Sequence, residues 1–254
     1  MRDVNVPGEI ASLRGSRPYF DQSRLPDANL KYVAWVDLMG ASSIMSRSLP
    51  IAANHVGKIH VAALKAKEGI AAASNIYPVV DGVYVTSPTQ DEVLAVVKRM
   101  VRSLAITFVL EDEPLHSFML RGSVSYGPVF EGSEMRSCST PLQQEQDYAR
   151  YVLLGPALTN AHDGERCASP FGIWIHESAR AFAPAGQRPI TATHWRWWDT
   201  TIAQERYDRS LASALTEHLL AYFVWCEAHS TYLLYEKERI CAHRARAEEY
   251  FGAM

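Results

Sequence analysis

The sequence predicts an α+β domain of the ferredoxin-like type. Three observations support this prediction. Strand and helix patterns alternate between residues 31 and 180, one tight hairpin interrupts the alternation, and 48% of the 254 residues are hydrophobic, enough to bury a core. The expected order is β-α-α-β-β-α-β, followed by a further helix, a strand and a C-terminal helical extension.

Residues up to 87 supply the first strands. Pro and Gly interrupt residues 1–30, which predicts an irregular arm. Residues 31–37 (KYVAWVD) are rich in aromatic and β-branched residues, which predicts a strand. Small polar residues open a helix at 42–49, and apolar residues recur at helical spacing over 55–74. Two short apolar runs within 75–87 flank Asp81-Gly82, a strong hairpin signal.

Residues 89–178 continue the alternation. Thr89 is placed to cap a long helix over 89–110, which has two acidic residues in its first turn. The remaining expected elements, in order, are a strand at 118–132, a polar loop near 131–147, a strand remnant turning into a helix within 151–167, and a strand at 171–178.

The character of the chain changes near residue 189. An aromatic-rich segment, ITATHWRWWDTT, precedes about 40 residues with helical periodicity, which we expect to form two helices or one kinked helix packed on the domain or on a dimer partner. The three tryptophans of THWRWWD are expected to serve packing rather than form an aromatic cage. The predicted domains are therefore an arm (1–30), a main α+β domain (31–188) and an aromatic and helical extension (189–254).

Composition narrows the possible partners. A net charge of -3 argues against a broad cationic surface for nucleic acid. The four cysteines form no C-x-x-C pair, the N-terminus does not read as a signal peptide, and no apolar run approaches the roughly 20 residues of a membrane span. We therefore expect a cytoplasmic protein without membrane insertion.

Two carboxylates indicate a cation site. Asp37 ends the first predicted strand and Asp81 lies in the hairpin, so the two converge if those strands are neighbours. Paired carboxylates repel each other unless a cation lies between them, and oxygen ligands suit Mg²⁺ or Mn²⁺. The alternative is that Asp37 caps a helix and Asp81 is an ordinary turn residue.

The stretch DLMGASS follows the first strand and begins a helix. Backbone N–H groups at a helix start attract phosphate, so a metal site beside them suggests a nucleoside triphosphate. The expected contacts are Leu38, Met39, Gly40, Ala41 and Ser42.

Four blocks in order resemble the class III nucleotidyl cyclases: VAWVDLMGASS, IYPVVDGVYV, LRGSVSYGPVFEG, and YVLLGPALTNA with GIWIHESA. The resemblance covers roughly residues 31 to 180. It implies that Asp37 and Asp81 hold two metal ions with the carbonyl of Leu38 as a further ligand. It also implies attack of the ribose 3′-oxygen on the α-phosphate, release of pyrophosphate, and a homodimer with shared active sites.

Two departures from the family concern the base. Tyr77 stands where purine cyclases of this family have a Lys, and Val152 stands where they have an Asp. Tyr77 would narrow the pocket and contact a smaller base. A lone strand Tyr more often faces the core, but the place of Tyr77 in the hairpin block favours the binding role. The pattern resembles the bacterial pyrimidine cyclases of the Pycsar anti-phage system, which implies conversion of UTP to cyclic UMP as a signal for a separate effector.

Alternatives remain at this point: a cytidylate cyclase, a purine cyclase with an unusual base pocket, or a non-catalytic nucleotide-sensing domain. Retention of both acidic residues argues against the last.

The family also has an Asn and an Arg that support the transition state. Alignment of the fourth block puts Thr159 at the position of the Asn and Asp163 at the position of the Arg. A shift of the alignment by one residue puts Asn160 at the first position, and Arg166 is the nearest Arg on that helix. A capping Asn and a solvated Arg explain the last two residues equally well.

Overall fold

The computed structural model describes residues 19–70, 74–199 and 205–252 and shows an α+β protein. The described residues fall into two compact units. One holds those up to Ala28 together with Phe130–Leu153, and the other holds Asn29–Val129 together with the chain from Leu154 onward. The domain boundaries expected near residues 30 and 188 stay a prediction.

The larger unit is built on a sheet in which β1, the first strand of the described chain, lies between β3 and β4. The strands of its continuous path run in the order β2-β3-β1-β4-β6-β7. Their bounds are β1 Asn29–Leu38, β2 Asn75–Val79, β3 Gly82–Ser87, β4 Leu120–Glu131, β6 Ile173–Ile175 and β7 His194–Trp195. β1 pairs antiparallel with both β3 and β4, and β4 pairs parallel with β6. With helices between β1 and β2 and between β3 and β4, this is the split-βαβ order, so the ferredoxin-like prediction is confirmed.

Helices connect these strands. In the larger unit they are α2 Ala41–Arg47, α3 Leu49–Lys67, α4 Gln90–Val109, η3 Pro114–His116, α8 Pro156–Gly164, η5 Glu165–Cys167, α9 Glu177–Ala181, α10 Glu205–Ala228, α11 Ser230–Leu233 and α12 Lys237–Phe251. The smaller unit has η2 Gln22–Arg24, α5 Gly132–Met135, η4 Arg136–Cys138, α6 Thr140–Gln144 and α7 Gln146–Ala149, and β5 Leu153–Leu154 follows. Among the described helices, none combines the length and apolar character that a membrane crossing requires.

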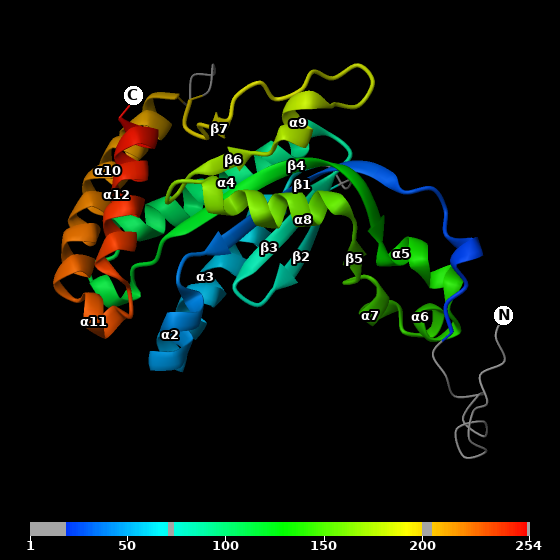
Figure 1. The fold of residues 1–254 in the computed structure, drawn as a ribbon, viewed down its shortest axis with the longest axis horizontal. Helices are drawn as coiled ribbons and strands as arrows, with labels where there is room; N and C mark the ends of the chain where they lie inside the picture. The colour runs from blue at the N-terminus through cyan, green and yellow to red at the C-terminus, as the bar shows by residue number, and fades with distance from the viewer. Residues whose placement is uncertain (1–18, 71–73, 200–204, 253–254) are drawn as a thin grey trace, which may run out of the picture. The chain divides into compact units, whose positions relative to one another are not determined.

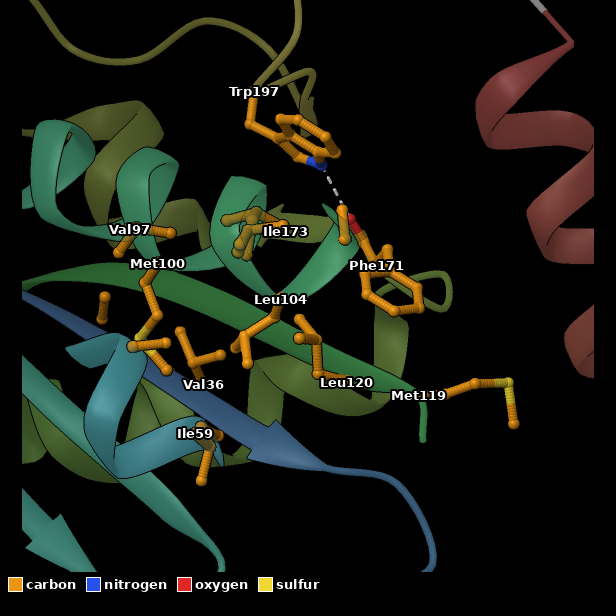
Figure 2. Close-up of a cluster of buried hydrophobic side chains, with 14 of the residues drawn as sticks. Val36, Ile59, Val97, Met100, Leu104, Met119, Leu120, Phe171, Ile173 and Trp197 are labelled. Atoms are coloured by element: carbon orange, nitrogen blue, oxygen red, sulfur yellow. Dashed lines mark hydrogen bonds between the residues drawn. The ribbon is translucent and has the colours of Figure 1, made fainter. Parts of the chain in front are cut away.

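The two faces of β1 differ because successive side chains of a strand point in opposite directions. Ala34 and Val36 join the main core. Figure 2 shows Val36 in this core together with Ile59 of α3 and Met100 of α4. The alternate residues of β1 face α8, which crosses the sheet on the side opposite α4 (Figure 1). We call this second side the α8 face.

The C-terminal helices pack on the larger unit itself. Trp197 Nε1 donates to the carbonyl of Phe171 at 3.0 Å, and the Trp198 ring stacks on Phe251 with centroids 4.8 Å apart. Both tryptophans are fully or nearly fully buried, so the packing interpretation of the aromatic segment is confirmed for them. α10 lies against α4 and α12 (Figure 1), with the short α11 between the two long helices.

Several predicted elements differ from the structure. The polar loop expected near 131–147 is wrong, because this segment forms the short helices α5, η4, α6 and part of α7. The helix expected at 55–74 begins earlier, at Leu49, and ends at Lys67; residues 71–73 lie outside the described chain. Thr89 occupies the N-cap position of α4, but its side chain makes no capping hydrogen bond; its hydroxyl lies 3.5 Å from that of Ser87 instead.

Asp208 anchors α10 to α4. Its side chain is 2% exposed and forms ion pairs with Lys98 at 3.0 Å and with Arg102 at 2.8 Å. Removing one partner of a buried ion pair leaves the others uncompensated, and charged hydrogen bonds contribute about 1.5–3 kcal/mol each.

We therefore predict that Asp208→Asn lowers the free energy of unfolding by about 2–3 kcal/mol, measured by urea denaturation. Asp199→Asn is the matched control, because the Asp199–Arg209 pair is more than half exposed on both sides and should contribute less than about 1 kcal/mol. Equal effects of the two substitutions would contradict an anchoring role for Asp208.

Candidate functional site

The pairing of β1 brings the two predicted acidic residues to one edge of the sheet. Asp37 lies opposite Gly82 of β3, one residue after Asp81. The N–H of Leu38 donates to the carbonyl of Asp81 at 3.1 Å, which ties the end of β1 to the hairpin turn. Asp81 also raises the pKa of Asp37 through its charge. The expectation that the two carboxylates converge is met.

The turn itself is one residue earlier than the sequence signal suggested. β2 ends at Val79 and β3 begins at Gly82, so Val80 and Asp81 form the connection. A Cβ at Gly82 would come within 2.4 Å of the Trp35 ring. Gly82 is thus required in the strand for close approach of Trp35, and Asp81 is left at the tip beside Asp37.

The structure adds two residues that sequence reasoning missed, Arg121 and Glu165. Arg121 of β4 lies directly across from Asp37 in the ladder. It donates through Nε and Nη2 to the two carboxylate oxygens of Glu165, at 2.8 and 2.7 Å. Glu165 is only 5% exposed. A charged residue inside the strand pattern LRGSV was the available signal for Arg121, whereas nothing local marks Glu165.

Asp37 is therefore held in an environment that disfavours its ionised form. Burial, then the charges of Glu165 and Asp81, raise the pKa of Asp37 to about 7. Arg121 and the backbone N–H of Leu38 act in the opposite direction. Since Arg121 is already bound by Glu165 in a bidentate pair, the site carries more negative charge than its own cation balances.

This charge excess fits a divalent cation. No three His, Cys, Asp or Glu side chains of the described residues are gathered so that they alone would hold a metal ion. Mg²⁺ is commonly held by one or two carboxylates plus substrate phosphates, rather than by a cage made wholly of protein. Asp37 and Asp81 supply such a partial ligand set, and added positive charge would favour ionised Asp37.

An aromatic wall adjoins the carboxylates on the α8 face. The Trp35 ring lies 4.4 Å from the Tyr84 ring and 5.8 Å from the His162 ring, between centroids. Tyr77 is the cross-strand neighbour of Tyr84 and is 6% exposed. Tyr77 therefore lies on the same sheet face as Asp37, two pairing rows away, and it is buried.

The segment after β1 makes the predicted turn into a helix. Gly40 has φ +77°, a left-handed conformation that favours glycine, and a Cβ there would meet nothing within 4 Å. The N–H of Met39 is already used, because it donates to the carbonyl of Met119 at 2.9 Å. Ala41 is buried and Ser42 is exposed. The phosphate contacts expected from Leu38 to Ser42 stay a prediction.

The remaining predicted residues lie elsewhere. Asn160 is on α8 and Arg166 is on η5, and no hydrogen bond or ion pair between described atoms joins either side chain to Asp37 or Asp81. The carbonyl of Arg166 accepts from Arg246 at 2.9 Å. Val152 belongs to the smaller unit, where it lies close to Gly132.

Comparison with known proteins gives structural likeness only. No protein-family model and no curated protein matches the chain. A double mutant of the guanylyl cyclase domain of the RhoGC fusion protein from the aquatic fungus Blastocladiella emersonii is 15% identical over 61% of this chain and 83% of that one, with a TM-score of 0.46. The guanylate cyclase domain of RhGC from Catenaria anguillulae, in complex with GTP, is 14% identical over 60% and 81%, with a TM-score of 0.44.

A bacterial light-regulated adenylyl cyclase is 17% identical over 56% of this chain and 71% of that one, with a TM-score of 0.43. At these identities and scores the likeness concerns the arrangement of strands and helices, and the chemistry of the site rests on its own residues.

The pKa of Asp37 predicts a pH dependence of stability. Its folded value of about 7 exceeds the ordinary 3.8, so between about pH 4 and 7 the folded chain keeps a proton that the unfolded chain has lost. Without divalent metal, the contribution of Asp37 should therefore lower the free energy of unfolding as pH rises through this window. Asp37→Asn should remove this contribution, which is measured as the difference between the two urea-unfolding series.

Added Mg²⁺ at pH 7.5 should raise the unfolding midpoint of the wild type and not that of Asp37→Asn. Asp112→Asn, which changes an exposed carboxylate, is the control and should behave as the wild type. Parallel pH profiles for wild type and Asp37→Asn would show that Asp37 titrates normally.

Proposed function

We propose that this chain is a nucleotidyl cyclase that forms a 3′,5′-cyclic nucleotide and pyrophosphate from a nucleoside triphosphate. The observation that carries the proposal is the placement of Asp37 beside Asp81, in a setting that raises the pKa of Asp37 to about 7. The resemblance of four ordered sequence blocks to class III cyclases supplies the reaction class. The ferredoxin-like sheet supports it, because its pairing brings the first two blocks together.

Asp37 and Asp81, with the carbonyl of Leu38, would hold two Mg²⁺ or Mn²⁺ ions, which supply positive charge at the α-phosphate and the 3′-oxygen when bound. The chain's own residues orient these ligands. The Leu38 N–H fixes the backbone of Asp81, and the β1–β4 ladder places Arg121 against Asp37. Arg121 and Glu165 form a bidentate pair that holds the guanidinium in one orientation beside the carboxylates.

The reaction balances without a further reactant. The ribose 3′-oxygen forms a bond to the α-phosphorus, and the bond from that phosphorus to the bridging oxygen breaks. Pyrophosphate leaves with this bond's electron pair, and the proton of the 3′-hydroxyl passes to water. The protein's task is then to align the 3′-oxygen with the leaving group and to stabilise the charge that develops on the phosphates.

A homodimer with shared sites is part of the proposal. Asn160 and Arg166 make no contact with the acidic pair of their own chain by hydrogen bond or ion pair. In such a dimer, Asp37 and Asp81 of one chain would face Tyr77 and the fourth-block residues of the other chain, as the family resemblance implies. Two-fold symmetric dimers are the commonest homo-oligomers.

The base preference is proposed from Tyr77 and Val152, neither of which offers the polar partners that a purine cyclase uses. Tyr77 is 6% exposed and packs on the Tyr84 strand, so its ring reduces the space available on that face. We propose UTP as the preferred substrate and cyclic UMP as the product. By its resemblance to the Pycsar cyclases, the protein would act in the bacterial cytoplasm and signal phage infection to a separate effector.

Replacement of either acidic residue should abolish cyclisation. We expect Asp37→Asn and Asp81→Asn to lower kcat/KM by at least about 1,000-fold, because removal of metal-ion catalysis costs several kcal/mol of transition-state stabilisation. The assay incubates purified protein with each of the four nucleoside triphosphates and Mn²⁺, and identifies products by mass. Asp112→Asn controls for general charge effects and should keep wild-type turnover, whereas near-normal turnover in either acidic variant would refute the metal assignment.

Tyr77 should control base selectivity. Shape alone discriminates by roughly 10- to 200-fold, so the wild type is expected to favour UTP over ATP and GTP by about that range. Tyr77→Ala should enlarge the site, lower the turnover of UTP and reduce this preference, while Tyr77→Phe tests the hydroxyl without changing bulk. Relative kcat/KM for the four substrates is the measurement, and a wild-type preference for a purine would overturn the pyrimidine proposal.

A further inference from the structure

A small cavity lies beside the candidate site, between the turn after β1 and the C-terminal helices. Its volume is about 100 Å³. The β1–α2 turn contributes Met39 and Gly40 to its lining, and the start of β4 contributes Arg121. All of its lining belongs to the larger unit. The cavity begins two residues after Asp37 and includes Asp37's own cross-strand neighbour.

The charged side chains that line the cavity are cationic. Arg47, Arg121 and Arg239 line it, and no described lining residue is Asp or Glu. Arg121 is bound by Glu165. Arg239 is exposed and makes neither an ion pair nor a hydrogen bond with any described residue. Arginine is the side chain best suited to bidentate recognition of phosphate oxygens, so an unpaired Arg at such a cavity indicates an anion.

Arg47 is held in place without losing its charge. Its Nε donates to the carbonyl of Ser43 at 3.1 Å, and its guanidinium lies over the Tyr232 ring, 5.2 Å from the centroid. Both partners are uncharged, so the remaining guanidinium N–H groups stay available. The C-terminal segment thus positions one arginine through Tyr232 and contributes the second, Arg239 of α12.

Tyr235 and His243, which also line the helical wall, stay neutral at physiological pH. Tyr235 Oη lies 2.5 Å from His243 Nδ1. Burial, then the charge of Arg121, lowers the pKa of His243 to about 4, and burial raises the pKa of Tyr235 well above its ordinary value. The positive charge of the cavity therefore comes from its arginines alone, and it persists across the physiological pH range.

The size of the cavity decides the class of ligand. The volume of about 100 Å³ is well below the roughly 300–1,000 Å³ of pockets for drug-sized ligands. This small volume favours a compact anionic group, such as one or two phosphates, over a whole nucleoside. The position next to Asp37 places such a group beside the carboxylates rather than at a remote surface.

We propose that this cavity binds a pyrophosphate group, with Arg47 and Arg239 as its ligands. The inference rests on the proposed function for the source of the group, which is either the terminal phosphates of the bound triphosphate or the pyrophosphate released from it. It assigns a binding role to the C-terminal helices, since α12 supplies one of the two arginines from the same chain.

The test is titration of the full-length protein with inorganic pyrophosphate, followed by calorimetry. Arg239→Gln and Arg47→Gln should each weaken binding by about 10- to 100-fold, as expected for loss of a charge-assisted hydrogen bond. Arg244→Gln is the matched control: it lies on the same helix, it is paired with Glu248 outside the cavity, and it should bind as the wild type. Because Arg239 is exposed and unpaired, its variant should keep the wild-type melting temperature.

The same variants in the cyclisation assay separate the two sources. A raised KM for the triphosphate in Arg239→Gln identifies the substrate's terminal phosphates, whereas an unchanged KM with weaker product inhibition identifies released pyrophosphate. Unchanged pyrophosphate affinity in both Arg239→Gln and Arg47→Gln would overturn the proposal even if the chain is an active cyclase. Arginine-dependent pyrophosphate binding without turnover of any nucleoside triphosphate would support the cavity and refute the cyclase.

Discussion

The register of β1 between β3 and β4 is the constraint on which the site depends. It places Asp37 across from Arg121 on one side and next to the Asp81 turn on the other. Side chains of a strand alternate between faces, so a slip of one residue would send Asp37 into the core beneath α3 and α4. The apolar residues Ala34 and Val36 prevent this slip, since they fill that core. Packing of the core face of β1 thereby determines that Asp37 points to the α8 face.

The charge balance at the end of β1 connects the fold with the proposed chemistry. Glu165 accepts from Nε and Nη2 of Arg121, so this guanidinium offsets the charge of Asp37 only in part. A half-buried carboxylate in this position takes up a proton near neutral pH or binds another cation. The arrangement lowers stability in the metal-free chain and favours a bound divalent ion, which is the compromise between stability and function expected of an active site.

The C-terminal helices have two roles in the same structure. Asp208, Trp197 and Trp198 fasten them to the domain through a buried ion pair and aromatic packing. The same helices form one wall of the cavity that begins beside Asp37. Rigid attachment to α4 is what allows a residue as far along the chain as Arg239 to be held near the first strand. Stability and binding at this end of the molecule therefore depend on one set of contacts.

Local patterns in the sequence determined much of this protein. Alternation and apolar spacing predicted β1, the β2–β3 hairpin, α4 and β4, because side-chain period reflects local backbone geometry. The same patterns placed Asp37 at a strand end and Asp81 in a turn. Only the tertiary structure decided the pairing of Arg121 with Glu165, which are 44 residues apart, and the approach of α12 to the turn after β1. Such contacts leave no local periodicity, because they depend on the packing of distant segments rather than on the conformation of any one of them.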